Sequence, residues 1–318
     1  MLKNNKFARI FSAVFFFLLI TFTFNSSISW MSSPQQKEIN MFPQKYRIVS
    51  PPFPNKLDFC GEKVPLENMD VWERIDREFI VNSYWHSATV LYLKRANRWF
   101  PVIEPILEAN KIPDDMKYLA IAESGFDNVV SPKGATGFWQ FISEAGKKYG
   151  LEINNEIDER YHVEKSTEAA CKYLNDSYNK FGTWAMAAAS YNMGENGVET
   201  QMERQKTNNY YNLVLGEETS RYMARIISLK IIMEHPEYFG FSVDSDDLYR
   251  PYETFDVSVS GKIDNFADFA LQYGINYKIL KMYNPWLREN YLTNRKKQTY
   301  VIKMPLRGSI YVIPEHEF

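Results

Sequence analysis

The strongest candidate for chemistry in this sequence is a single carboxylate, Glu123. Met116, Leu119 and Ala120 precede it at helical spacing, and Glu123 continues the same apolar stripe, which faces the core in a folded domain. A carboxylate on that side loses hydration, so its pKa is expected to rise, as a general acid near neutral pH requires. The alternative is a structural carboxylate that is buried against an arginine.

Two polar segments follow Glu123 along the chain. Residues 131–140 form a loop with two glycines, and glycine lets a backbone come close to a ligand. Ser190, Tyr191 and Asn192 end an alanine-rich helix. Taken singly, each segment is more typical of a turn or of a core than of a site. Together they offer hydroxyl, amide and ring groups to the surroundings of Glu123.

In this order, the segments resemble the four motifs of the lytic transglycosylases with a lysozyme-like, goose-type fold. The motifs are Glu123-Ser124, Gly137-Phe138-Trp139-Gln140, Ser190-Tyr191-Asn192 and Tyr222. The resemblance is to the membrane-bound lytic murein transglycosylase D type. It covers residues 69–241, and it includes Asp158-Glu159-Arg160 and Lys165-Ser166-Thr167. It implies a mainly α fold, with a lysozyme-like α+β catalytic domain.

The resemblance also implies an enzyme that cleaves the β-1,4 bond between N-acetylmuramic acid and N-acetylglucosamine in peptidoglycan. Glu123 is then an acid that protonates the glycosidic oxygen, and next a base that accepts the proton of the C6 hydroxyl. The product ends in 1,6-anhydromuramic acid, and the attacking hydroxyl is already in place because it belongs to the same sugar. The substrate-binding positions implied are Ser124, Ser131, Gln140, Tyr191, Asn192 and Tyr222.

The sequence departs from the usual motifs at a few positions. Phe138-Trp139 stands where Leu-Met is usual, Ser190 where Ala is usual, and Met193 and Glu195 where Ala and Pro are common. These changes are expected to alter the packing of the cleft and to leave the acid in place.

Two other functions remain open from the sequence. A lysozyme-type hydrolase needs a second carboxylate, but Asp127 lies beyond the helix-ending Gly125, and Asp158 and Glu195 are more typical of surface or pairing residues. A non-catalytic peptidoglycan-binding protein is the other alternative, which the retained Glu123 opposes. No metal site is expected, since none of the four histidines has ligand spacing to another, and no cofactor is expected.

Helices are expected to position these residues between Met69 and Phe239. Expected helix starts are Pro113, a cap at Ser143, Ser166 or Thr167, a cap at Thr183, and about Glu218; expected ends are Gly125, Gly150, Gly182, Met193-Gly194 and Pro236. The catalytic domain is therefore placed at residues 69–245.

A small βααβ module is expected at residues 246–318. Strands at 254–259 and 299–304 enclose helices at 266–273 and 277–283, and Asn284-Pro285 breaks the chain between them. The module resembles a degenerate LysM domain, a fold that binds N-acetylglucosamine polymers. The usual Gly-Asp-Thr is replaced by Gly261-Lys262-Ile263, so glycan binding and a purely structural cap both remain open.

The first residues predict export. Lys3, Lys6 and Arg9 precede the apolar run Phe11–Phe24, so residues 1–29 are interpreted as a signal peptide or an uncleaved N-terminal anchor. Proline-rich residues 30–68 are expected to form an extended linker or a strap on the surface. The predicted location is the periplasm or cell envelope, with membrane contact only through the N-terminal segment.

The composition limits the classes of binding partner that are expected. The net charge is -2 and no long basic run is present, which argues against a nucleic-acid partner. The expected partners are peptidoglycan glycan strands, with other cell-wall enzymes as candidates. Cys171 lies in an alanine-rich helical run and is expected to be a small buried side chain, and its pairing with Cys60 is left open.

Overall fold

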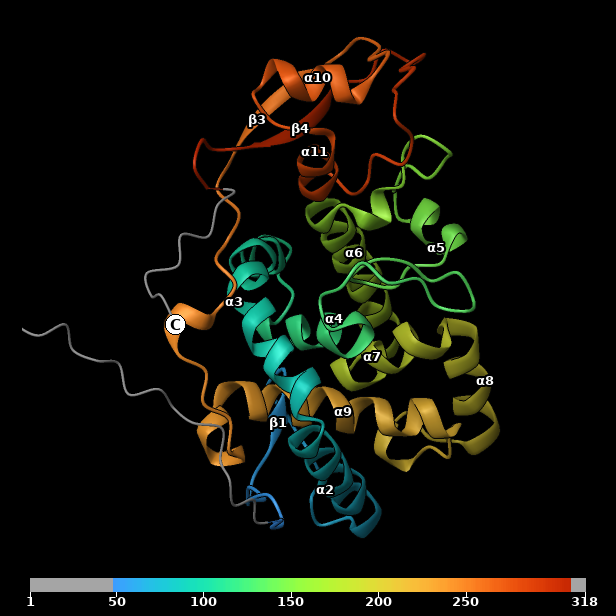
Figure 1. Ribbon diagram of the computed structural model, residues 1–318. Helices are drawn as coiled ribbons and strands as arrows, with labels where there is room; N and C mark the ends of the chain where they lie inside the picture. Colours follow the sequence, from blue (N-terminus) through green and yellow to red (C-terminus); the bar gives the residue numbers. More distant parts are fainter. Residues whose placement is uncertain (1–47, 310–318) are drawn as a thin grey trace, which may run out of the picture. The chain divides into compact units, whose positions relative to one another are not determined.

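The computed structural model describes residues 48–309 (Figure 1). Of these, residues 50–309 belong to one compact unit. The predicted signal peptide or anchor lies outside the described residues, as does the first part of the predicted linker. Within residues 48–309, every helix is too short or too polar to cross a membrane.

The fold is mainly helical, as the sequence predicts. The helices up to the C-terminal module are α2 (Met69–Tyr84), α3 (His86–Ala109), η1 (Asp114–Met116), α4 (Lys117–Ser124), α5 (Ser143–Lys148), η2 (Glu159–Tyr161), α6 (Val163–Phe181), α7 (Trp184–Met193), α8 (Glu195–Gln205), η3 (Tyr210–Asn212), α9 (Glu217–Glu234), η4 (Pro236–Phe239) and η5 (Ser245–Asp247). Short α4 packs against α3 and α9, and α9 also packs against α2 and α7. Met116, Leu119 and Ala120 are fully buried there.

Several helix boundaries lie where the local sequence predicts them. Gly125 stops α4 in the left-handed conformation, with φ +60°, which costs glycine little. The hydroxyl of Thr183 accepts a hydrogen bond from the Met186 amide (3.3 Å) and so caps α7. Gly182 ends α6. The positions of these breaks confirm the sequence interpretation.

Two helix starts differ from the prediction. Ser143 is the first residue of α5 rather than its cap. Helix α6 begins at Val163, three residues before Ser166. The hydroxyls of Ser166 and Thr167 donate backward to the Val163 carbonyl (3.2 and 2.7 Å), so they lie inside the first turns instead of capping them.

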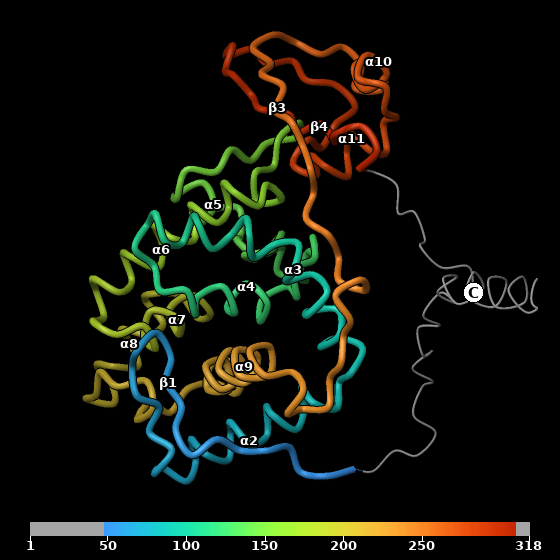
Figure 2. The backbone as a smooth tube through the Cα atoms, turned by 90° about the vertical axis from the view of Figure 1, so that its left-hand side faces the viewer, coloured from blue at the N-terminus to red at the C-terminus, as the bar shows by residue number. Residues whose placement is uncertain are grey.

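Residues 50–68, assigned to the linker from the sequence, contribute to the main core. They contain the hairpin of β1 (Asp58–Phe59) and β2 (Glu62–Lys63), and the buried side chains of Leu57, Phe59 and Val64. The Glu62 carboxylate accepts from the first two amides of α7, at 2.6 and 3.1 Å. Figure 2 shows this segment passing α2 and rising beside α9.

The two cysteines are free. Cys171 is fully buried in α6, as its surroundings predict. Cys60 lies in the turn between β1 and β2 and donates its backbone amide to Asp115 (2.6 Å).

The C-terminal module has the βααβ order predicted from the sequence. Strands β3 (Thr254–Val259) and β4 (Tyr300–Pro305) pair antiparallel, with Val257 opposite Ile302, and they enclose α10 (Phe266–Gln272) and α11 (Tyr277–Tyr283). Its core is a separate cluster around Phe266 and Leu280. Ile157, from the helical part of the chain, completes this cluster.

The segment before α6 forms hydrogen bonds with the C-terminal module. The Glu156 carboxylate accepts from the amide and hydroxyl of Thr293 (2.7 and 2.9 Å), and its carbonyl accepts from the Arg288 amide (2.8 Å). The Asp158 amide donates to the Trp286 carbonyl (2.9 Å). The module is therefore docked on the helical part by backbone and side-chain contacts, and not only linked to it.

Two glycines of one loop provide a matched test of this packing. Gly134 and Gly137 both have φ +77°, but a Cβ on Gly137 would lie 2.0 Å from the Arg160 carbonyl oxygen, whereas a Cβ on Gly134 meets open space. We expect Gly134→Ala to cost about 1 kcal/mol from the backbone conformation alone, and Gly137→Ala at least twice as much. Urea unfolding measures both, and equal losses would contradict the close approach.

Candidate active site

Glu123 lies half-buried in the last turn of α4, one residue before the helix ends. The hydroxyl of Tyr222, a buried residue of α9, donates a hydrogen bond to its carboxylate. Burial raises the pKa of Glu123 to about 7, although the Tyr222 hydrogen bond and the charge of Arg225 lower it. The negative charge of Glu218 adds to the rise. The protonated and charged forms are thus both accessible near neutral pH.

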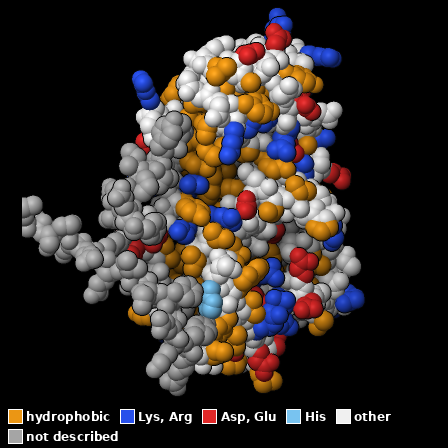
Figure 3. Space-filling view, in the orientation of Figure 1, with side chains coloured by type: hydrophobic (Ala, Val, Ile, Leu, Met, Phe, Trp, Pro, Cys, Tyr) orange, Lys and Arg blue, Asp and Glu red, His pale blue; other side chains and the backbone are white. Residues whose placement is uncertain are grey.

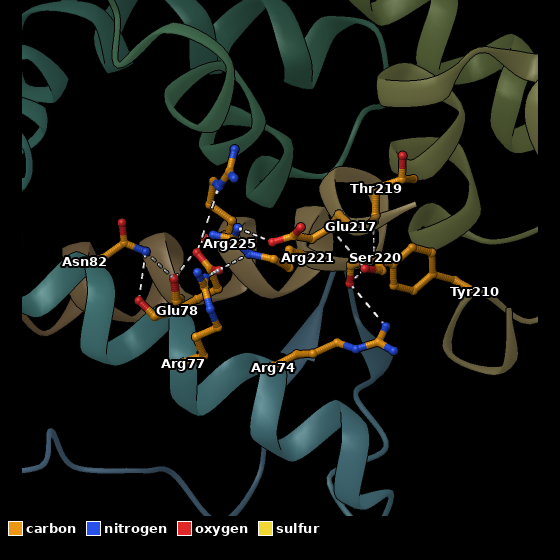
Figure 4. A network of polar contacts seen from close by, with 11 residues as sticks. Arg74, Arg77, Glu78, Asn82, Tyr210, Glu217, Thr219, Ser220, Arg221 and Arg225 are labelled. Carbon is orange, nitrogen blue, oxygen red and sulfur yellow. Dashed lines mark hydrogen bonds and ion pairs between the residues drawn. The ribbon is translucent and has the colours of Figure 1, made fainter. Parts of the chain in front are cut away.

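A second buried glutamate ties α9 to α2. Glu78, 1% exposed on α2, pairs with Arg77 (2.6 Å) and Arg221 (2.8 Å), and Arg225 lies 3.9 Å from its other oxygen. Figure 4 shows these arginines converging on Glu78 from both helices. Because α9 also carries Tyr222, the contacts of Glu78 fix the helix that delivers the hydroxyl to Glu123.

Hydrogen bonds join the loop of the second motif to α4. Ser124 donates through its hydroxyl to the Phe138 carbonyl (2.9 Å). Gln140 donates through its amide to the carbonyls of Gly137 (2.7 Å) and Val129 (3.1 Å). These side chains, predicted to bind substrate, shape the loop beside the carboxylate in this structure.

Ser131 has a similar local role. Its hydroxyl accepts from the Ala135 amide (3.0 Å) and its amide donates to the Ala135 carbonyl (2.8 Å). These two bonds close the turn at residues 131–135. Contact of Ser131 with a sugar stays a prediction.

The third motif connects the loop to α9. Tyr191 donates to the Trp139 carbonyl (2.6 Å), and Asn192 accepts from the Thr219 hydroxyl (2.7 Å). Burial and the charge of Glu123 raise the pKa of Tyr191 well above its usual value, so the phenol stays a neutral donor. The structure therefore brings Glu123, Tyr191 and Tyr222 together. Asn192, near the end of α7, contacts the first turn of α9.

The bulky pair of the second motif is part of the core. Trp139 is fully buried and donates through Nε1 to the Thr167 hydroxyl (2.8 Å). Phe138 is also buried and packs edge-on against Trp99, with ring centroids 5.0 Å apart. Both side chains therefore pack behind the loop, and their effect on the cleft stays a prediction.

The three acids considered as second carboxylates are each engaged elsewhere. Asp127 is mostly exposed and pairs with Arg95 (2.9 Å). Asp158 pairs with Arg160 (2.7 Å), and Glu195 pairs with Lys180 (3.1 Å).

Sequence reasoning missed two charged residues that act on the Glu123 carboxylate, and the buried Glu78 that pairs with one of them. Glu218 is exposed at the start of α9, and its charge acts on Glu123. Arg225 follows Tyr222 by three residues on the same helix, a spacing that could have pointed to it. Glu78 continues the apolar stripe of Val71 and Ile75, and this is the same pattern that Glu123 shows on its own helix.

Among residues 48–309, no group of three or more His, Cys, Asp or Glu side chains is placed to hold a metal ion.

Two protein families match the chain. The Transglycosylase SLT domain matches residues 102–214, and the soluble lytic transglycosylase C-terminal LysM-like domain matches residues 255–308. The chain contains a transglycosylase SLT domain and a LysM-like domain. The first match includes Glu123, Gln140, Tyr191 and Asn192, whereas Tyr222 lies beyond its end.

Two curated relatives that are named transglycosylases, and one with a different name, are similar to the chain. The chain is 28% identical over 235 residues to the membrane-bound lytic murein transglycosylase D of Escherichia coli strain K12, which covers 71% of this chain and 50% of that protein. The protein of the same name from Escherichia coli O6:H1 gives the same values. A putative tributyltin chloride resistance protein of Alteromonas sp. strain M-1 is 29% identical over 117 residues, 36% of this chain and 56% of that protein.

The chain spans about half the length of the first two relatives. It is homologous to membrane-bound lytic murein transglycosylase D over that part.

Replacement of Glu78 tests whether its buried ion pairs stabilise the contact between α2 and α9. Glu78→Gln leaves Arg77 and Arg221 beside a neutral amide, so we expect a loss of about 3 kcal/mol in the free energy of unfolding. Glu217→Gln is the matched control, because Glu217 pairs with the same Arg221 (3.5 Å) but is 83% exposed. It should cost less than about 1 kcal/mol. Urea unfolding measures both variants. Equal losses in the free energy of unfolding would contradict the claim that burial strengthens the ion pairs of Glu78.

Proposed function

We propose that the protein is a peptidoglycan lytic transglycosylase in which Glu123 acts first as acid and then as base. The observation that carries this proposal is the half-buried carboxylate of Glu123, with a pKa raised to about 7 and a hydrogen bond from Tyr222. A carboxyl group with this pKa is protonated in a large fraction of molecules at neutral pH, as the first step requires. The SLT domain match and the homologous transglycosylase support the same reaction class.

In the first step, protonated Glu123 donates its proton to the oxygen of the β-1,4 bond between N-acetylmuramic acid and N-acetylglucosamine. The bond between that oxygen and the anomeric carbon breaks, and N-acetylglucosamine leaves with the proton. Glu123 is now charged, and the Tyr222 hydroxyl stabilises this form because it donates to the carboxylate.

In the second step, charged Glu123 accepts the proton of the C6 hydroxyl of the same muramic acid. The C6 oxygen bonds to the anomeric carbon and closes the 1,6-anhydro ring. No water is consumed, and Glu123 returns to its protonated form. Tyr191 and Asn192 are proposed to line the cleft beside this sugar, while Ser124, Ser131 and Gln140 hold the loop that borders it.

The alternative is a lysozyme-type hydrolase, and one observation gives it a specific form. Glu218 is exposed and its charge raises the pKa of Glu123, so it is the acid to test as the base that activates a water. A hydrolase of this kind requires a base across the cleft from the acid. Asp127 does not fit that role, because its carboxylate pairs with Arg95 and faces solvent.

Because peptidoglycan is found in the cell envelope, the proposed substrate also implies a location there. Residues 1–29 are proposed to direct export to the periplasm, by cleavage or as an anchor. Other cell-wall enzymes remain candidate partners.

The products of digestion decide between the two reactions. We expect purified sacculi to yield muropeptides that end in 1,6-anhydro-N-acetylmuramic acid, each lighter by one water than a lysozyme product, as mass spectrometry can show. Glu123→Gln should abolish their release, while Glu195→Gln, the matched control, should retain it, because Glu195 pairs with Lys180. Reducible, hydrated ends whose release is lost in Glu218→Gln would assign the protein to the hydrolases instead.

A further inference from the structure

A pocket of about 510 Å³ lies where the helical part of the chain meets the C-terminal module. We call it the junction pocket. Its walls come from α3, the loop after α4, residues 249–254, α11 and β4, and include Arg98, Trp99, Tyr252, Met282 and Trp286. Its volume lies in the range of ligand sites. Figure 3 shows hydrophobic side chains gathered below the module, with Lys and Arg side chains among them.

Part of the wall of the junction pocket belongs to the loop that follows Glu123. Phe126, Asp127 and Asn128 line it, and they follow Glu123 by only three to five residues. Phe138 of the second motif lines it too. The loop after α4 therefore joins the proposed acid to the wall of the junction pocket.

Aromatic rings dominate the wall. Trp99, Tyr161, Tyr249, Tyr252 and Trp286 all face the pocket. Such rings present flat apolar faces with polar edges, which suit ligands that are partly apolar and partly hydrogen-bonding, as sugar rings are.

The charge of the wall points to an anionic ligand. Arg95 pairs with Asp127, and Lys303 pairs with Glu164 (3.1 Å). Arg98 differs, since its guanidinium lies against the Tyr252 ring (4.4 Å to the centroid) and donates to the Arg250 carbonyl (2.9 Å). Within residues 48–309, no carboxylate forms an ion pair with it.

We propose that the junction pocket binds a further muramic acid unit of the glycan strand, with a carboxylate of its stem peptide at Arg98. Guanidinium groups suit carboxylates because they offer several donors in one plane. This inference rests on the proposed function. It gives the LysM-like module a specific role, because Met282, Trp286 and Lys303 complete a site that the SLT domain has only in part.

Binding to uncleaved strands tests the proposal. In a full chain carrying Glu123→Gln, affinity is measured by calorimetry for glycan strands with intact stem peptides and for the same strands after chemical amidation of their peptide carboxylates. We expect Arg98→Gln to weaken binding of strands with free carboxylates about tenfold and to leave binding of amidated strands unchanged. Arg98→Lys should restore part of the loss. Equal effects on both strands, or no effect, would overturn the carboxylate contact.

A second pair of variants tests the pocket itself without altering its charge. Met282→Trp fills the pocket from the module side and should weaken binding of both kinds of strand. Leu271→Trp is the control, because Leu271 is exposed on the same module and does not line the pocket. If the two variants bind alike, the pocket is not a glycan site. The proposed reaction fails separately, through hydrated products from the chain with Glu123 intact.

Discussion

The site depends on one hydrogen bond, from the Tyr222 hydroxyl to the Glu123 carboxylate, formed where α9 crosses α4. Burial alone favours the neutral acid, and the hydroxyl partly offsets this by stabilising the charged form. The raised pKa also links the site to stability. The protonated carboxyl stabilises the fold below about pH 4.5, and this contribution is lost as the pH rises through about 7. The site thus weakens the fold in the range where the proposed reaction uses both forms.

Two glutamates on apolar helix stripes have different hydrogen-bond partners in this fold. Glu123 accepts a hydrogen bond from a neutral phenol, whereas Glu78 accepts hydrogen bonds from two charged arginines. Both continue a helical stripe, although only the burial of Glu123 was predicted from the sequence. The stripe does not reveal Tyr222 and Arg221 as partners, because they come from α9, about 100 to 140 residues further along the chain, whereas Arg77 is adjacent to Glu78. The resemblance to a family, rather than the stripe, selected Glu123 as the acid.

Local signals predicted the fold well where a single residue decides a helix end. Gly125 and Thr183 act as expected because their effects depend on adjacent backbone only. The start of α6 was misplaced, since a hydroxyl that bonds backward looks like a cap in sequence. The core role of residues 50–68 and the junction pocket depend on long-range packing. Neither leaves a periodic pattern that a sequence could show.

The pKa of Glu123 tests the central claim most directly. Carbon-13 NMR of labelled glutamate, assigned with Glu123→Gln, follows the carboxyl group through a pH titration. We expect a midpoint near 7 in the unaltered chain. In Tyr222→Phe the midpoint should be higher, because the lost hydrogen bond favoured the charged form. A midpoint near 4.5 in the unaltered chain would contradict the account, since Glu123 would then be fully charged at neutral pH and unable to act as the acid.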